Sequence, residues 1–272
     1  MADIPFTNYM VLDAFKKEID YPGIVSKVDE SKKVLANWKD IVRFVPKDGV
    51  KWESHNNVIG MTGAGEGRIS DYFIHKDKNI SFNIYVLNGK TNREVLDRAL
   101  ILGSNVSMNQ VPYKYLVNGP GDFYFYNGQV GPGGLDRDAV CVYKNVIIEI
   151  STVSNDVDVR DVVAYLVGEA EKHLISPNEI PALVYTKVQS SEKVKSGDNF
   201  TIGLKVSEAN RKKYQVEPSL GFPGEGIESL SVADGQFELK AQDPGAYDLR
   251  LWVMDTENLY AEEVSFSIQV HN

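Results

Sequence analysis

The clearest hydrophobic pattern in the chain lies between Asp234 and Val270, near the C-terminus. Apolar and polar residues alternate there in three segments, and this period of two is typical of strands with one buried face. Between the first two segments lies Asp243-Pro244-Gly245, in which proline presets φ and glycine accepts the positive φ of a type II turn. We therefore predict three antiparallel strands. Their apolar positions are Phe237, Leu239 and Ala241, then Tyr247, Leu249, Leu251 and Val253, then Val264, Phe266, Ile268 and Val270.

The N-terminal part mixes helical and strand periods. Apolar residues at helical spacing predict a helix over 31–44, and Thr91-Asn92-Arg93-Glu94 is a capping box for a helix that ends at Gly103. Asp156 or Asp158 is placed to cap a closing helix. The strands between them predict an α+β domain with a mostly antiparallel sheet. They are expected at 50–52, 58–61, 69–74, 80–87, 111–117, 123–126, 139–143 and 146–153.

A domain boundary is expected at residues 175–181, a segment with two prolines and no hydrophobic period. Every later segment reads as strand. At 272 residues the chain is long enough for two domains that each bury a core. We therefore predict an α+β domain over 1–178, followed by an all-β sandwich over 182–272.

Composition and charge exclude several classes of protein. With 43% hydrophobic and 25% charged residues, the chain resembles an ordinary globular protein. The formal net charge of −9 argues against a nucleic-acid binder or a binder of anionic membranes, because both depend on basic patches. No run of eighteen apolar residues occurs, so we expect no transmembrane segment.

Cys141 is the only cysteine, so the chain forms no internal disulfide and no thiolate metal cage. It lies in the middle of a predicted strand, where a cysteine usually behaves as a small buried hydrophobe and not as a nucleophile. No serine has the G-x-S-x-G setting of a nucleophile elbow. Carboxylate pairs are set by spatial arrangement, and the sequence does not test them.

The segment Gly63-Ala64-Gly65-Glu66-Gly67 has the glycine content of a phosphate-binding loop. The dinucleotide fingerprint requires another glycine where Arg68 stands, and it requires a helix where residues 68–74 read as strand. We therefore predict a glycine-rich hairpin turn.

A metal site is the one cofactor site that the residues leave open. His55 and His75 lie in neighbouring predicted strands, with Asp71 between them, and a hairpin could gather the three into a two-histidine, one-carboxylate site. The alternative is that these side chains are solvated on a strand face, because no H-x-H or H-E-x-x-H spacing occurs.

A second candidate is a run of aromatic residues beside two glycine-rich loops, at 118–121 and 128–134. Exposed tyrosines next to such loops suit stacking on a sugar or an interface hot spot. The alternative is that helices cover both faces of the sheet. The candidate ligand-binding residues are Tyr113, Tyr115, Tyr124 and Tyr126, and Phe123 and Phe125 alternate with the last two.

Residues 182–272 resemble the bacterial cadherin-like or immunoglobulin-like sandwich. The likeness is carried by Val194 to Thr201, by Asp234-Gly235-Gln236-Phe237, and by Asp243-Pro244-Gly245-Ala246-Tyr247 before Val253-Met254-Asp255. It implies export from the cytoplasm and a mature form whose leader is removed. Calcium-binding relatives use clustered acidic residues between domains, for which Asp255 and Glu257 are the nearest match here.

Residues 32–174 show a looser resemblance in layout to uncharacterised bacterial secreted or lipoprotein domains, through Trp38 or Trp52 and the segments ISFNIYVL and CVYKNVIIEI. Taken together, these features lead us to expect a non-enzymatic envelope protein, periplasmic, cell-surface or secreted. It would bind a protein or glycan partner through residues 1–178, and the sandwich would serve as a spacer. Two alternatives stay open: a hydrolase with its site at His55, Asp71 and His75, and a purely structural subunit.

Overall fold

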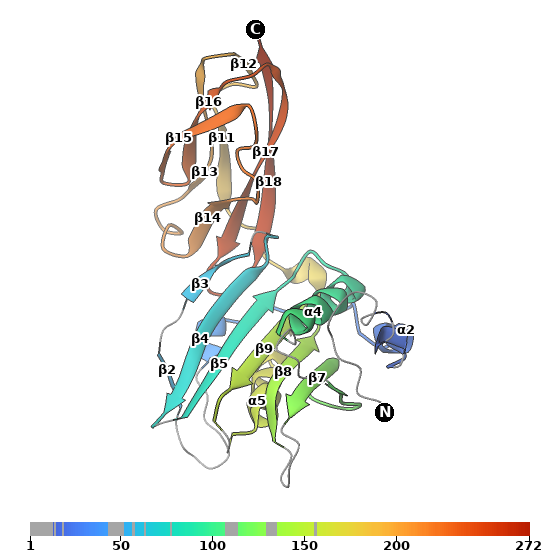
Figure 1. Cartoon of the computed structure of the whole chain (residues 1–272). Helices are drawn as coiled ribbons and strands as arrows, with labels where there is room; N and C mark the ends of the chain where they lie inside the picture. The colour runs from blue at the N-terminus through green and yellow to red at the C-terminus, as the bar shows by residue number, and fades with distance from the viewer. Residues whose placement is uncertain are drawn as a thin grey trace. The chain divides into compact units, whose positions relative to one another are not determined.

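Figure 1 shows the computed structural model, which describes residues 13, 15–17, 19–42, 52–55, 58–62, 64–76, 78–106, 114–128, 135–154 and 157–272. The chain divides into two compact units. Unit 1 contains residues 1–59 and 68–180, and unit 2 contains residues 60–67 and 181–272. The main boundary therefore falls at the end of the segment expected to be a linker. No helix of the described residues is long and apolar enough to cross a membrane.

An eight-stranded sheet forms the centre of unit 1, and all of its pairings that the structure describes are antiparallel. Its order is β2-β4-β5-β9-β8-β7-β6, and β3 pairs with β4. The mixed α+β character and the antiparallel sheet are as predicted. The strands are β2 (Glu53–Ser54), β3 (Val58–Met61), β4 (Gly67–His75), β5 (Lys78–Val86), β6 (Lys114–Tyr115), β7 (Phe123–Gly128), β8 (Asp136–Tyr143) and β9 (Val146–Thr152).

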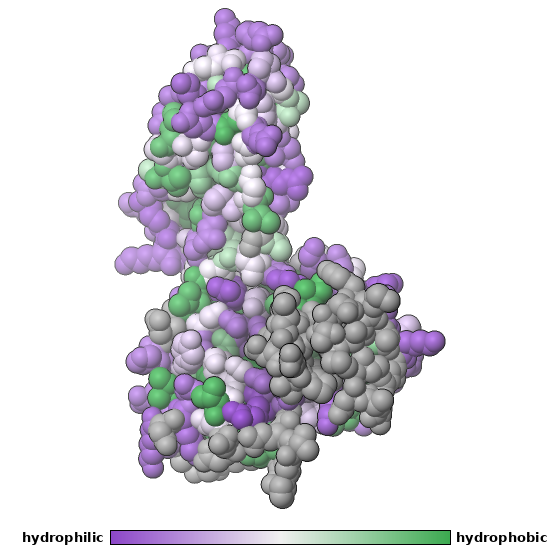
Figure 2. Space-filling view, viewed as in Figure 1, coloured by the Kyte–Doolittle hydropathy of each residue, from purple (hydrophilic) through white to green (hydrophobic). Residues whose placement is uncertain are grey.

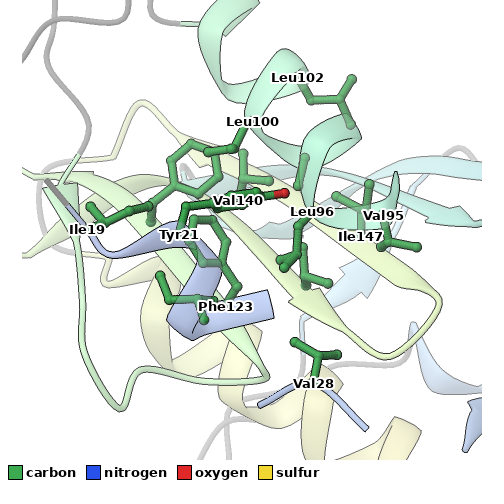
Figure 3. Close-up of a cluster of buried hydrophobic side chains, with 14 of the residues drawn as sticks. Ile19, Tyr21, Val28, Val95, Leu96, Leu100, Leu102, Phe123, Val140 and Ile147 are labelled. Atoms are coloured by element: carbon green, nitrogen blue, oxygen red, sulfur yellow. The ribbon is translucent and has the colours of Figure 1, made fainter. Parts of the chain in front are cut away.

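The two long helices lie on opposite faces of this sheet (Figure 1). The helix α4 (Asn92–Val106) and the short α2 (Tyr21–Val25) cover one face. The other face is covered by α5 (Val159–Glu171). This two-sided cover explains why residues 139–143 of β8 are all buried. The core beneath α4, drawn in Figure 3, includes Leu96, Leu100, Phe123, Phe125, Val140, Val142 and Ile147.

The helix predicted over 31–44 is wrong. Lys33–Val34 forms β1, which pairs with β10 (Leu174–Ile175), and within the described residues 31–42 only α3 (Trp38–Ile41) is helical. The cause is a buried side chain from a distant hairpin. Asn145 accepts a hydrogen bond from the Val34 amide at 2.6 Å and donates one to its carbonyl at 3.3 Å, which holds the segment extended. Tertiary contacts thus override the local period.

Unit 2 packs two four-stranded sheets around one core. Their orders are β11-β13-β16-β15 and β12-β18-β17-β14, and β12 runs parallel to β18. The strands are β11 (Tyr185–Gln189), β12 (Lys193–Lys195), β13 (Asn199–Val206), β14 (Tyr214–Pro218), β15 (Ile227–Ala233), β16 (Gln236–Ala241), β17 (Gly245–Asp255) and β18 (Ala261–His271). A 3-10 turn, η2 (Pro177–Glu179), precedes them.

The three strands predicted near the C-terminus exist as β16, β17 and β18, but only the last two pair with each other. β16 pairs with β13 and β15 in the opposite sheet, so the connection at Asp243-Pro244-Gly245 crosses between sheets. Gly245 has no positive φ, so the type II turn predicted there is wrong as well. Alternation marks the face that each strand buries, and it does not identify the partner strand.

Candidate functional site

The two histidines proposed as metal ligands lie on opposite faces of the sheet. Glu53 is paired with Ile74 and Ser54 with Phe73, so one step further places His75 opposite Trp52. The His55 amide donates to the Tyr72 carbonyl at 3.1 Å, and His55 lies three residues after Trp52 along the chain. Paired residues share a face and successive residues alternate, so an odd separation puts the two imidazoles on different sides.

Asp71, the third proposed ligand, is buried and supports the backbone. Its Oδ1 accepts from the His55 amide at 3.2 Å and from the Tyr72 amide at 2.6 Å. The His75 ring lies against the Trp52 ring, with centroids 5.9 Å apart. Within the described ranges, no three His, Cys, Asp or Glu side chains are placed to hold a metal ion. The geometry gives the proposed metal centre, and the hydrolase built on it, no support.

Among the aromatic residues, Tyr124 and Tyr126 face α5 and not open solvent. Tyr124 is 1% exposed, and its hydroxyl donates to Oδ2 of Asp136 at 2.8 Å. Burial, followed by the nearby Asp136 carboxylate, raises the pKa of Tyr124 far above its usual value. Tyr126 is half-buried and stacks on Tyr124 at 5.9 Å, with the Arg160 guanidinium 5.6 Å from its ring. Tyr113 lies outside the described residues.

The contacts behind these tyrosines fix α5 to the sheet. Asp136 is fully buried, and its carboxylate accepts hydrogen bonds from Nε and Nη2 of Arg160 at 2.8 and 2.9 Å. Asp158 caps α5 through the Arg160 amide at 3.0 Å and also accepts from the Asp136 amide at 3.3 Å. Desolvation by burial raises the pKa of Asp158. We interpret this network as a structural clamp that holds β7, β8 and α5 together.

A pocket of about 150 Å³ lies beside the same aromatic run, where β6 turns into β7. One wall comes from Ile24 and Lys27, and another from the half-buried ring of Tyr115. Tyr115 stacks on Phe123 at 5.1 Å. The remaining lining is Leu116, Val117, Asn118, Gly119, Gly121, Asp122, Phe123 and Tyr124.

The turn that forms the rim of this pocket depends on two glycines. A Cβ on Gly119 would lie 2.8 Å from the Cβ of Tyr124. Gly121 has φ +75°, and a Cβ there would lie 2.6 Å from both the Cys141 sulfur and the Val142 carbonyl oxygen. No ordinary side chain fits such distances, so the turn requires glycine at both positions.

An ion pair between Asp122 and Lys144 stabilises the same turn. The Asp122 carboxylate accepts from the Lys144 amide at 2.8 Å and from its ammonium at 3.1 Å. The pocket therefore combines an aromatic wall, the backbone and Asp122 of a rigid turn, and Lys27 from the segment after α2. Such a lining offers hydrogen-bond partners beside an aromatic surface.

Cys141 packs against the same turn and is not placed to act as a nucleophile. The thiol is fully buried and donates to the Pro120 carbonyl at 3.2 Å. Desolvation by burial raises the pKa of Cys141 well above its usual value, which disfavours the reactive thiolate.

Sequence reasoning missed two half-buried carboxylates on the α4 side of the sheet. Glu149 is paired with Asn83, and Asp138 with Ser151. Oε2 of Glu149 accepts from the Tyr85 hydroxyl at 3.1 Å and from Asn83 at 3.3 Å. Burial raises the pKa of both carboxyls. A lone carboxylate inside an apolar run was the only sequence signal for Glu149.

In unit 2, the carboxylates considered for calcium already contact a cation of the same chain. The Lys213 ammonium lies 3.2 Å from Asp255 and 3.1 Å from Glu257. Hydrogen bonds to Glu257 and then Asp255 raise the pKa of Lys213. Asp255 is buried and also orders its own turn by accepting from the Glu257 amide at 2.9 Å.

The glycine-rich segment at 60–67 belongs to unit 2 and packs closely within it. Gly65 has φ +76°, and a Cβ there would lie 2.2 Å from the Trp252 ring. A Cβ on Gly67 would lie 2.0 Å from the Leu259 carbonyl oxygen. These glycines permit close packing, which accounts for them without a phosphate ligand.

No protein-family model matches the chain, and no curated protein has a similar sequence.

Proposed function

We propose that the chain is a non-enzymatic binding protein that holds one sugar unit of a glycan in the unit 1 pocket. The observation that carries this proposal is the lining: the Tyr115 ring, the backbone of the 116–122 turn, Lys27 and Asp122 converge on one hollow. A sugar presents hydroxyl groups and apolar C–H faces, so its recognition requires polar groups beside an aromatic surface.

The size of the pocket agrees with a small group. About 150 Å³ corresponds to roughly five water molecules at about 30 Å³ each. The two glycines and the Asp122–Lys144 pair hold the rim in place before any ligand arrives. A preformed rim lowers the entropy lost on binding.

A glycan is favoured over a protein partner because the aromatic side chains are not displayed. Protein hot spots require large side chains that a partner can bury. Tyr124 is 1% exposed, and Tyr126 lies against Arg160. Tyr115 and Tyr124 both line the pocket, and Tyr115 is the more exposed of the two.

We further propose that unit 2 is an immunoglobulin-like spacer and that the protein acts outside the cytoplasm. The order β11-β13-β16-β15 corresponds to A-B-E-D, and β18-β17-β14 corresponds to G-F-C, in the immunoglobulin arrangement. Near the start of β17, the Tyr247 hydroxyl donates to the Asp243 carbonyl at 2.8 Å, as in a tyrosine corner. The resemblance of residues 182–272 to exported sandwiches supports the location.

The test is a glycan array with the full chain, followed by thermal shift and calorimetry with each hit. A ligand at about 100 times its Kd should stabilise the native state by about 2.7 kcal/mol. Tyr115→Ala should abolish the shift, and the exposed Lys27→Glu should weaken it without affecting the fold. Tyr72→Ala, at a 49% exposed position on β4 that does not line the pocket, is the matched control.

Two results would refute the proposal. One is an array on which no glycan binds. The other is a glycan that binds Lys27→Glu and Tyr115→Ala as tightly as the wild type.

A further inference from the structure

The two sheets of unit 2 end in four edge strands: β11, β12, β14 and β15. Edge strands expose unpaired backbone groups, and natural proteins protect them with lysine, proline, short length, a β-bulge or a covering segment. β12 has three residues, two of which are lysines, and β14 ends in Pro218. Both edges therefore carry a recognised form of protection.

β11 is protected by side chains that reach the neighbouring sheet. The Lys187 ammonium donates to the Ser265 carbonyl at 2.7 Å and lies 4.6 Å from the Phe266 ring. Gln189 donates to the Ser267 carbonyl at 3.0 Å. These contacts cover the gap between β11 and β18, so a further strand has no free access there.

β15 has neither lysine, proline nor short length, and its protection is a β-bulge between Ser229 and Ser231. It is the longest of the four, with seven residues, and every residue after Ile227 is exposed. It contains no lysine, arginine or proline, and Glu228 is its only charge. Leu230 and Val232 are 42% and 60% exposed. Figure 2 shows hydrophobic residues, in green, along the side of unit 2 where β15 lies.

We propose that β15 pairs antiparallel with β15 of a second copy of this chain, which joins two four-stranded sheets into one of eight strands. Antiparallel pairing supplies hydrogen-bond partners to the exposed backbone of both edges. It is the pairing of a two-fold dimer, in which the same surface meets itself.

The charge pattern of β15 favours this occupant. Glu228 lies near one end of the strand, and the remaining positions are uncharged. Antiparallel pairing places the two Glu228 carboxylates at opposite ends of the seam, whereas parallel pairing would place them side by side. The centre of the seam brings Leu230 of each copy together, with no charge for a different partner to recognise.

The dimer is expected to be weak. A single strand pair buries much less than the roughly 1,200 Å² of a standard stable interface. The β-bulge between Ser229 and Ser231 also interrupts the regular register. We therefore expect a dissociation constant in the micromolar range or above, so detection requires a concentration series.

The test is analytical ultracentrifugation of the full chain from about 1 μM to about 1 mM. The wild type should pass from monomer to dimer over this range. Val232→Glu should raise the dissociation constant at least tenfold, because antiparallel pairing centred on Leu230 places residue 232 opposite Glu228 of the second copy, and like charges directly across two strands repel. Val184→Glu is the matched control, since Val184 is 62% exposed and precedes β11.

The pocket of unit 1 plays no part in this assembly. The proposal of glycan binding and the proposal of dimerisation are therefore tested independently of each other. Circular dichroism on each variant shows that the sandwich is folded. The proposal is overturned if the wild type remains monomeric throughout the series. It is equally overturned if Val232→Glu and Val184→Glu dimerise alike, because the seam would then lie elsewhere.

Discussion

Replacing Arg160 by methionine tests the clamp between α5 and the sheet. The substitution keeps an apolar stem of similar length and removes both N–H donors that reach Asp136. Asp136 is 0% exposed, and the Tyr124 hydroxyl at 2.8 Å would still donate to it. One neutral hydrogen bond does not compensate a buried carboxylate that has lost its cation.

The expected cost follows from the burial of the two partners. Removing one partner of a fully buried ion pair costs about 3–5 kcal/mol. Arg160 is 38% exposed in its side chain, so solvent screens part of this pair. We therefore expect a loss of about 2–3 kcal/mol. For a unit of this size, that corresponds to a fall of roughly 5–10 °C in the unfolding midpoint.

Urea denaturation followed by tryptophan fluorescence measures this loss. Trp38 and Trp52 lie in unit 1 and Trp252 in unit 2, so a Trp252→Phe background makes the signal report unit 1. Lys172→Met is the control: Lys172 also pairs with an acidic side chain at the end of α5, but it is 63% exposed.

We expect the control to cost about 0.5 kcal/mol or less. An apolar replacement of both partners, Arg160→Met with Asp136→Leu, should recover much of the loss. A cost for Arg160→Met no larger than that of Lys172→Met would refute the reasoning.

Two further substitutions test the turn and the sheet face. Gly121→Ala should lower the stability of unit 1 by at least about 1–2 kcal/mol in urea, through positive φ and contact with Cys141; Gly168→Ala, in α5 with open space around it, should be neutral or stabilising. Because burial raises the pKa of Glu149, its ionisation opposes folding, and stability returns as the pH falls through the raised pKa toward the ordinary value of 4.5. As the pH falls from about 7 to about 5, the unfolding midpoint of the wild type should therefore rise relative to that of Glu149→Gln. Parallel pH profiles of the two proteins would contradict this assignment.

Several elements were predictable because their signals are local. The capping box is present, since the Thr91 amide donates to Glu94 at 2.8 Å and the Glu94 amide donates to the Thr91 hydroxyl at 3.3 Å. Asp158 caps α5 as predicted. The predicted end of α4 at Gly103 is wrong, since the helix continues through Gly103 to Val106. A start signal lies within one turn, whereas glycine only weakens a helix and does not oblige it to end.

Partner choice among strands was beyond the sequence. Alternation identified β16 and β17 as strands with one buried face, and both do face the same core. It could not show that they belong to different sheets, because a buried face is satisfied equally by a neighbour or by the opposite sheet. The same limit applies to His55 and His75, whose faces follow from the register of β2 against β4.

The sequence by itself determined the last three strands of unit 2, the two long helices of unit 1 and the glycine turn beside the aromatic run, because these depend on periods and turn residues a few positions apart. Only the tertiary structure decided that Tyr124 is buried against Asp136 and that Tyr115 lines a pocket with Lys27. Alternation separates two faces of a strand and carries no information on what covers each face. That cover comes from α4, α5 and α2, which are distant in sequence.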